Sequence, residues 1–229
     1  PPQFGTVQIS IKPKNGSFIS DFNKDQILSK IKQYSVSGIN QKITDLKILY
    51  VELDSSVYYN YSLISSPNAL KTSVTDSLQK YSKSLDLNKF GGRFRYSKVQ
   101  QVIDNTDTSI TSNITKIIIR RDLKVVLSTP VQYELCYGNR FHVEPEGRNI
   151  KSTGFKIAGE SSTVYLTDTP NTDETTGILS LIKIVDGSSV IVAKEVGTVD
   201  YLKGELIFGP LNIIETEVSG NVVEIQAFP

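Results

Sequence analysis

The sequence has little of the side-chain chemistry that many enzymes use, because its 229 residues include one cysteine, one histidine and no methionine. The single Cys136 excludes an internal disulfide framework. The single His142 excludes metal sites built from several histidines. No apolar run approaches the ~20 residues that a membrane-spanning helix needs. Because the chain starts with Pro1 and has no methionine, we expect either a fragment of a longer protein or a sequence from which methionines are omitted.

Charge of either sign is also not in excess, since 25 Lys and Arg stand against 24 Asp and Glu, a net of +1. Nucleic-acid-binding domains usually have a clear basic excess, so we expect no nucleic-acid partner and no membrane partner. The charge is nevertheless unevenly distributed. Residues 1–125 carry 18 Lys and Arg against 10 Asp and Glu, a net of +8, and residues 126–229 carry 7 against 14, a net of −7. Opposite charges can join two copies or two halves of one chain, or the halves can be two ordinary solvated surfaces.

Hydrophobic spacing over residues 1–125 predicts an α+β domain with the order β-α-β-α-α-β. The predicted elements are a strand over 6–12, a helix beginning at Ser20, one bent strand or two strands over 44–61, a helix beginning at Ser66-Pro67, a helix over 96–103 and a strand over 110–121. Such an order is typical of a small mixed sheet with short helices on one face.

Residues 126–229 are predicted to form a mostly β domain, because short apolar runs alternate with turn clusters. The dipeptide Asp186-Gly187 lies between two apolar runs and predicts a tight hairpin. Regular strand spacing favours a small sandwich or an open barrel. We therefore expect an α+β chain of two domains, 1–125 and 126–229, with the boundary placed to within about ten residues.

No constellation of residues predicts catalysis or metal binding. A nucleophilic triad would use His142 with Cys136 or a serine, but Cys136 lies in an apparent strand, where cysteine is more often a small buried hydrophobe. The carboxylates of Asp168, Asp173 and Glu174 could hold a hard cation, yet their spacing is not that of an EF-hand loop. A polar loop between strands is the simpler interpretation. We expect no enzymatic activity, no catalytic residue, no cofactor and no metal.

Two aromatic segments are candidates for a contact surface. Residues 90–96 place Arg93 and Arg95 between aromatic side chains, which suits single-stranded nucleic acid or a protein interface. The near-neutral charge favours the interface, and an ordinary loop between helices is the alternative. Tyrosines at the end of the strand predicted over 44–61 could pack within the sheet or form a contact surface. The interface candidates are Tyr58, Tyr59, Phe90, Arg93, Phe94 and Arg95.

The order of several segments resembles a known family. These segments are the opening Phe4–Pro13, the helical Ile27–Tyr34, the strand Thr44–Asp54 with Val57–Tyr61, and the late Gly197–Pro210. Together they resemble the baseplate J-like family of contractile tails and, more closely, the C-terminal part of the baseplate wedge proteins of T4-like phages. The resemblance covers most of the chain and rests on structural patterns that include no catalytic signature.

The resemblance implies a non-enzymatic structural protein of a viral tail baseplate. It implies a homodimer that contacts other wedge proteins and joins neighbouring wedges into a ring around the tail hub, and a ring that rearranges on contraction. The implied location is the virion, after assembly in the host cytoplasm. The alternative is a carbohydrate- or receptor-binding β module of a tail-associated adhesin, and a hydrolase with dispersed carboxylates is a third hypothesis.

Overall fold

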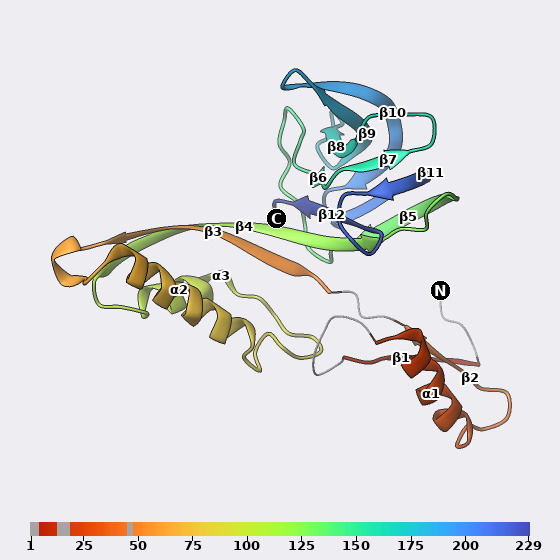
Figure 1. The fold of residues 1–229 in the computed structure, drawn as a ribbon, viewed down its shortest axis with the longest axis horizontal. Helices are drawn as coiled ribbons and strands as arrows, with labels where there is room; N and C mark the ends of the chain where they lie inside the picture. Colours follow the sequence, from red (N-terminus) through yellow and green to blue (C-terminus); the bar gives the residue numbers. More distant parts are fainter. Residues whose placement is uncertain (1–4, 13–18, 45–47) are drawn as a thin grey trace. The chain divides into compact units, whose positions relative to one another are not determined.

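The computed structural model of the chain describes residues 5–12, 19–44 and 48–229. The chain divides into two compact units, Pro1–Leu49 and Tyr50–Pro229. Figure 1 shows helices and strands in both units, and an α+β fold rich in strands agrees with the fold class that the sequence predicts. No helix within the described ranges is long and apolar enough to cross a membrane.

The first unit is a β-α-β segment, in which β1 (Thr6–Ser10) and β2 (Asn40–Thr44) pair in parallel and α1 (Asp21–Lys32) lies between them in the sequence. The helix begins where the sequence predicts, because Oγ of Ser20 accepts a hydrogen bond from the backbone N–H of Asn23 at 3.3 Å. The first strand is also confirmed, whereas β2 is short and polar and has no pattern that predicts it. None of the described residues of this unit is buried, so they form no core of their own.

The second unit begins with a helix-covered ribbon, which we call the arm. Its elements are β3 (Tyr50–Tyr59), the 3-10 helix η1 (Tyr61–Leu63), α2 (Pro67–Ser82), α3 (Tyr96–Asp104) and β4 (Ile110–Lys124). The strands pair antiparallel, and α2 and α3 lie along one face of the ribbon (Figure 1). On that face Val74, Val99 and Ile103 form a buried cluster, against which Leu53 and Val57 of β3 pack.

A local signal fixes the start of α2, the first helix of the arm. Oγ of Ser66 accepts a hydrogen bond from the backbone N–H of Ala69 at 3.1 Å, and Pro67 occupies the first turn of α2. The predicted helix at 67 is therefore confirmed, and α3 confirms the helix predicted over 96–103. Of the long strand predicted over 44–61, residues 50–59 form β3, and residues 45–47 lie outside the described residues.

The remainder of the second unit is built from strands, as the sequence predicts. These are β5 (Pro130–Cys136), β6 (Lys151–Ser152), β7 (Phe155–Ile157), β8 (Tyr165–Pro170), β9 (Thr176–Val185), β10 (Ser188–Asp200), β11 (Glu205–Thr216) and β12 (Val222–Ala227). One sheet has the order β5-β11-β10-β9-β8, with β7 paired to β11, and the other has the order β3-β4-β12-β6. Fully buried Phe155, Leu179, Leu181, Tyr201 and Leu206 belong to the core of this half.

The hairpin predicted at Asp186-Gly187 is confirmed. Val185 of β9 pairs with Ser188 of β10, so the two residues between them form the whole turn. Their φ angles are both positive, 50° for Asp186 and 78° for Gly187, as a type I′ turn requires. The sequence could predict this turn because only a few dipeptides adopt two successive positive φ angles at low cost.

The long strand β4 lies within the expected domain 1–125 but pairs with strands of both expected domains. It pairs with β3 from Ile110 to Arg120 and with β12 from Ile119 to Lys124. The boundary expected near residue 125 coincides with the end of β4. The sheet that contains β4 continues across this boundary, because it includes both β3 of the arm and β12 at the end of the chain. Independent folding of 1–125 and 126–229 stays a prediction.

Candidate assembly interface

The interface candidates fall into two groups at opposite ends of α2. Tyr58 and Tyr59 are at the end of β3, just before α2 begins, whereas Phe90, Arg93 and Arg95 follow the end of α2. A helix of 16 residues is about 24 Å long at 1.5 Å per residue. Figure 1 shows that α2 starts beside η1 and that its other end is directed away from η1. The structure thus does not bring the two groups into one site.

The first group lies at what we call the arm tip, defined by Tyr58, Tyr61, Leu63 and Ile114. The exposed fractions of these residues are 52%, 73%, 63% and 58% in that order. Tyr58 pairs with Ser112, and Ser56 pairs with Ile114, so Tyr58 and Ile114 are diagonal neighbours on the face that the helices leave open. The backbone is held there, because the N–H of Asn60 donates to the carbonyl of Ser109 at 2.8 Å. The arm tip is therefore an ordered apolar surface.

Tyr59 has a different role from its neighbour. Its side chain is half-buried and lines a groove of about 460 Å³ between β3 and α2, together with Leu70, Val74 and Leu78 of the helix. Of the two alternatives for these tyrosines, Tyr59 therefore fits packing within the arm, and Tyr58 fits a contact surface.

Arg93 and Arg95 of the second group line what we call the basic hollow, a depression of about 430 Å³ formed by the end of α2, the start of α3 and the segment between them. Its lining residues are Tyr81, Asp86, Lys89, Gly91, Arg93, Arg95 and Lys98. Phe94 packs against the buried cluster of the arm, so it anchors the segment, while Arg93 and Arg95 on either side of it are exposed. Phe90 is 62% exposed. Burial raises the pKa of Tyr81, the nearby Asp86 raises it further, and Arg95 opposes both.

The acidic residues considered for a cation site make hydrogen bonds to other residues of the chain. The carboxylate of Asp168 is buried and accepts hydrogen bonds from the backbone N–H of Ile150 and from the hydroxyl of Tyr201, both at 2.7 Å. Asp173 accepts a hydrogen bond from Oγ1 of Thr175 at 2.7 Å, and hydrogen bonds of this kind lower the pKa of its carboxyl. Within the ranges that the structure describes, no three His, Cys, Asp or Glu side chains gather as metal ligands do.

Cys136 and His142 likewise contact acidic neighbours. Sγ of Cys136 donates to Oε1 of Glu205 at 3.1 Å, between the paired strands β5 and β11. Nε2 of His142 lies 3.8 Å from Oε2 of Glu144, on an exposed segment. Each of the two side chains therefore contacts a carboxylate of a neighbouring residue in the fold.

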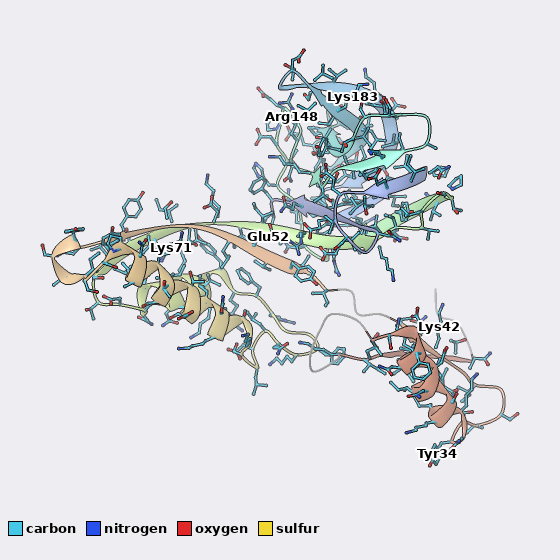
Figure 2. All side chains as sticks on the ribbon, viewed as in Figure 1. Tyr34, Lys42, Glu52, Lys71, Arg148 and Lys183 are labelled. Carbon is cyan, nitrogen blue, oxygen red and sulfur yellow. The ribbon has the colours of Figure 1, made fainter. Side chains whose placement is uncertain are left out.

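A cluster that the sequence does not predict connects the arm to the β half. The guanidinium of Arg120 lies 2.6 Å from Glu52 on β3, 2.9 Å from Asp122 on β4 and 3.6 Å from Glu224 on β12. Its Cζ atom lies 4.7 Å from the ring centroid of Tyr50. Burial lowers the pKa of Arg120, but the three carboxylates outweigh this effect and raise it. In Figure 2 the labelled Glu52 lies on the part of the ribbon beside the β half.

Two segments of the chain match family models. Residues 47–122 match baseplate structural protein gp6, C-terminal domain III, and residues 1–44 match baseplate structural protein gp6, C-terminal domain I. The first match spans the arm almost completely, and the second spans the elements of the first unit.

A curated relative agrees with both models. The baseplate wedge protein gp6 of Enterobacteria phage T4 is 24% identical to this chain over 154 residues, which is 67% of the chain. The matched part is 22% of the relative's own length, so the chain corresponds to about a fifth of that protein. The findings support a gp6-like structural protein of a bacteriophage baseplate.

Proposed function

We propose that this chain belongs to a protein that dimerises and links neighbouring wedges of a contractile tail baseplate into a ring around the tail hub. The ring rearranges when the tail contracts. The partners are a second copy and other wedge proteins, with no nucleic acid and no membrane. The protein acts in the virion after assembly in the host cytoplasm, catalyses no reaction, and belongs to the wider baseplate J-like family. The names of the matched gp6 models and of the T4 wedge protein support this proposal.

The observation that carries the proposal is the apolar surface at the arm tip. Single exposed apolar residues are ordinary on soluble proteins, but a group of them on an ordered projection is typical of a contact site. Tyr58 and Ile114 share the open face of the ribbon, with more than half of each residue exposed. The arm is also the segment matched by gp6 C-terminal domain III, so we assign the shared assembly function to it.

The size of the expected effect follows from the apolar area. Burying a large apolar side chain completely contributes about 1.5–3 kcal/mol, and half of each of these two side chains is still to be buried. In a two-fold dimer each residue counts twice, which gives about 4 kcal/mol in total. That corresponds to a change of about a thousandfold in the dissociation constant.

Light scattering coupled to size exclusion, run over a range of protein concentrations, tests the proposal. We expect a dimer for the unchanged chain at low and at high salt, because an apolar contact is little affected by screening. The double variant Tyr58→Ser/Ile114→Ser should be a folded monomer at the same concentrations. A matched control is Ile184→Ser/Ile191→Ser, which removes two equally exposed side chains from the β9–β10 hairpin and should remain dimeric.

Two results would contradict this assignment. If the unchanged chain is monomeric at every concentration, this part of the protein does not dimerise. If the arm-tip variant remains a dimer while the hairpin variant becomes a monomer, the contact is at the other end of the unit. Circular dichroism of each variant shows whether the fold is retained.

A further inference from the structure

The basic hollow has a charge that its own surroundings do not balance. Four basic side chains line it, Lys89, Arg93, Arg95 and Lys98, against the single acidic Asp86. In the part of the chain that the structure describes, none of the four lies within ion-pair distance of a carboxylate. Like charges held close together repel one another, so an acidic partner would stabilise this arrangement.

The segment that carries these charges is fixed in place. Phe94 packs against the buried cluster formed by Val74, Val99 and Ile103, and this contact orients the two flanking arginines. Gly92 permits the close turn before them, because a Cβ atom there would lie 2.5 Å from the carbonyl oxygen of Leu87. The side chains of Arg93 and Arg95 therefore project from a segment that is held by packing against the arm.

The residue at the N-cap of α3, just before the helix, is also unfavourable for local helix stability. Arg95 occupies the N-cap position and makes no side-chain hydrogen bond to the helix, within the described residues. The equivalent positions of α1 and α2 are Ser20 and Ser66, and both cap their helices. Cations beside a helix N-terminus are unfavourable, because that end has a partial positive charge. Residues that break a local rule without structural benefit are typical of functional surfaces.

We infer that the basic hollow binds an acidic protein segment, with two or more carboxylates, presented by a neighbouring baseplate subunit. The inference rests on the proposed assembly function and names the chemistry of one partner. Arginine suits this role because its planar guanidinium binds a carboxylate through two parallel hydrogen bonds. The exposed ring of Phe90, five residues before Arg95, adds an apolar contact that a protein segment can use.

Protein carboxylates fit better than nucleic-acid phosphates as the partner. The whole chain has a net charge of +1, and nucleic-acid binding needs a basic surface that extends along many phosphates. The hollow is confined to the last turn of α2, the segment that follows it and the first turn of α3. Its size and charge suit a few carboxylates at a subunit contact.

Fluorescence anisotropy with labelled octaglutamate as the probe tests this inference. We expect binding at low salt that weakens as salt is added, because exposed charges are screened. Labelled octaserine should not bind. The variant Arg93→Gln/Arg95→Gln should bind octaglutamate about tenfold more weakly, since two charge-assisted contacts are lost. The control Lys71→Gln/Lys116→Gln removes the same charge elsewhere on the arm and should change binding less than about twofold.

A second variant separates a binding role from a folding role. Replacing Arg95 with serine supplies the missing cap, so Arg95→Ser should raise the melting temperature while it weakens octaglutamate binding. A lower melting temperature would show that Arg95 stabilises the fold, and the inference would then be wrong. A labelled oligothymidylate of equal charge is the remaining probe, and tighter binding of this oligonucleotide than of octaglutamate would also overturn the inference.

Dimerisation and acidic-segment binding can fail separately. The variant Arg93→Gln/Arg95→Gln leaves the arm tip unchanged and should scatter light as the same dimer as the unchanged chain. If octaglutamate does not bind while the dimer persists, the inference about the hollow is wrong and the proposed function stands. If the dimer is absent and octaglutamate still binds, the arm-tip assignment is wrong and the hollow is confirmed as an acidic-segment site.

Discussion

Asp168 gives the sharpest test of whether an acidic residue of the β half stabilises the fold or binds a ligand. Its two carboxylate oxygens accept hydrogen bonds from two donors, the backbone N–H of Ile150 and the hydroxyl of Tyr201, at 2.7 Å each. Both sites are buried. The substitution Asp168→Asn keeps the shape but turns one acceptor into a donor, so the hydroxyl of Tyr201 must turn to accept from the amide, and its own proton then loses its acceptor inside the core.

The expected cost can be worked out from these contacts. Hydrogen bonds to a charged group contribute about 1.5–3 kcal/mol, and a buried donor without an acceptor costs about 1–3 kcal/mol. We therefore expect Asp168→Asn to lower the free energy of unfolding by about 3 kcal/mol. Tyr201→Phe removes one donor and leaves one carboxylate oxygen without a partner, so its expected cost is about 2 kcal/mol.

Urea unfolding measured by circular dichroism checks both values. The midpoint should fall with little change in the slope, as it does when only stability changes. The matched control is Asp186→Asn, on the exposed β9–β10 turn of the same half, where asparagine also suits the positive φ, so its stability should lie within about 0.5 kcal/mol of the unchanged chain. A value within that range for Asp168→Asn would refute the argument, and Asp168 would again be a candidate for ligand chemistry.

Three further predictions concern charge and backbone geometry. Replacing Arg120 with alanine leaves three carboxylates facing one another, and calorimetry should show a loss of about 2 kcal/mol, with Lys116→Ala as the neutral comparison. Hydrogen bonds lower the pKa of Asp173 from its ordinary 3.8, so the unfolded state binds a proton more readily than the folded state. The stability that results is complete above the unfolded-state pKa and is lost as the pH falls through the lower folded-state pKa. Asp173→Asn should reduce this loss in pH-dependent melting. Gly204→Ala should lower the free energy of unfolding by about 3 kcal/mol or more, because the added Cβ would overlap the carbonyl oxygen of Asn139. Gly220 also has a positive φ but open space around it, so Gly220→Ala should cost about 1 kcal/mol. Similar losses for both variants would show that the φ angle alone decides the cost.

The parts of the fold that the sequence predicts are those that short-range patterns determine. Ser20 and Ser66 cap the helices that follow them, and Asp186-Gly187 forms the expected hairpin. Each of these features depends on residues within a few positions of one another. The polar strand β2 is different, because its five residues form a strand only through parallel pairing with β1, some thirty-four positions earlier.

The candidate site divides in the same way. The sequence identifies Phe90, Arg93, Phe94 and Arg95 as a set, but it cannot tell that Phe94 packs inward while Arg93 and Arg95 line a hollow. That division depends on contacts with the buried cluster of α2 and α3. No local pattern predicts the cluster around Arg120, because its members are far apart in the sequence. Glu52 is 68 positions from Arg120. Gln226 donates to Glu52 at 2.7 Å and is 174 positions from Glu52.

The double pairing of β4 has a mechanical consequence. At about 3.3 Å per residue, its 15 residues reach about 50 Å without a break in the strand. Because the partners β3 and β12 overlap along β4 at Ile119 and Arg120, every residue of β4 from Ser112 to Lys124 has a strand partner, and no gap lies between the two partners where a hinge could open. A load applied to Tyr58 and Ile114 would therefore shear hydrogen bonds along the whole ribbon before it could bend the strand. The arm should behave as a stiff lever that turns together with the β half, and a displacement at one end would arrive at the other nearly undiminished.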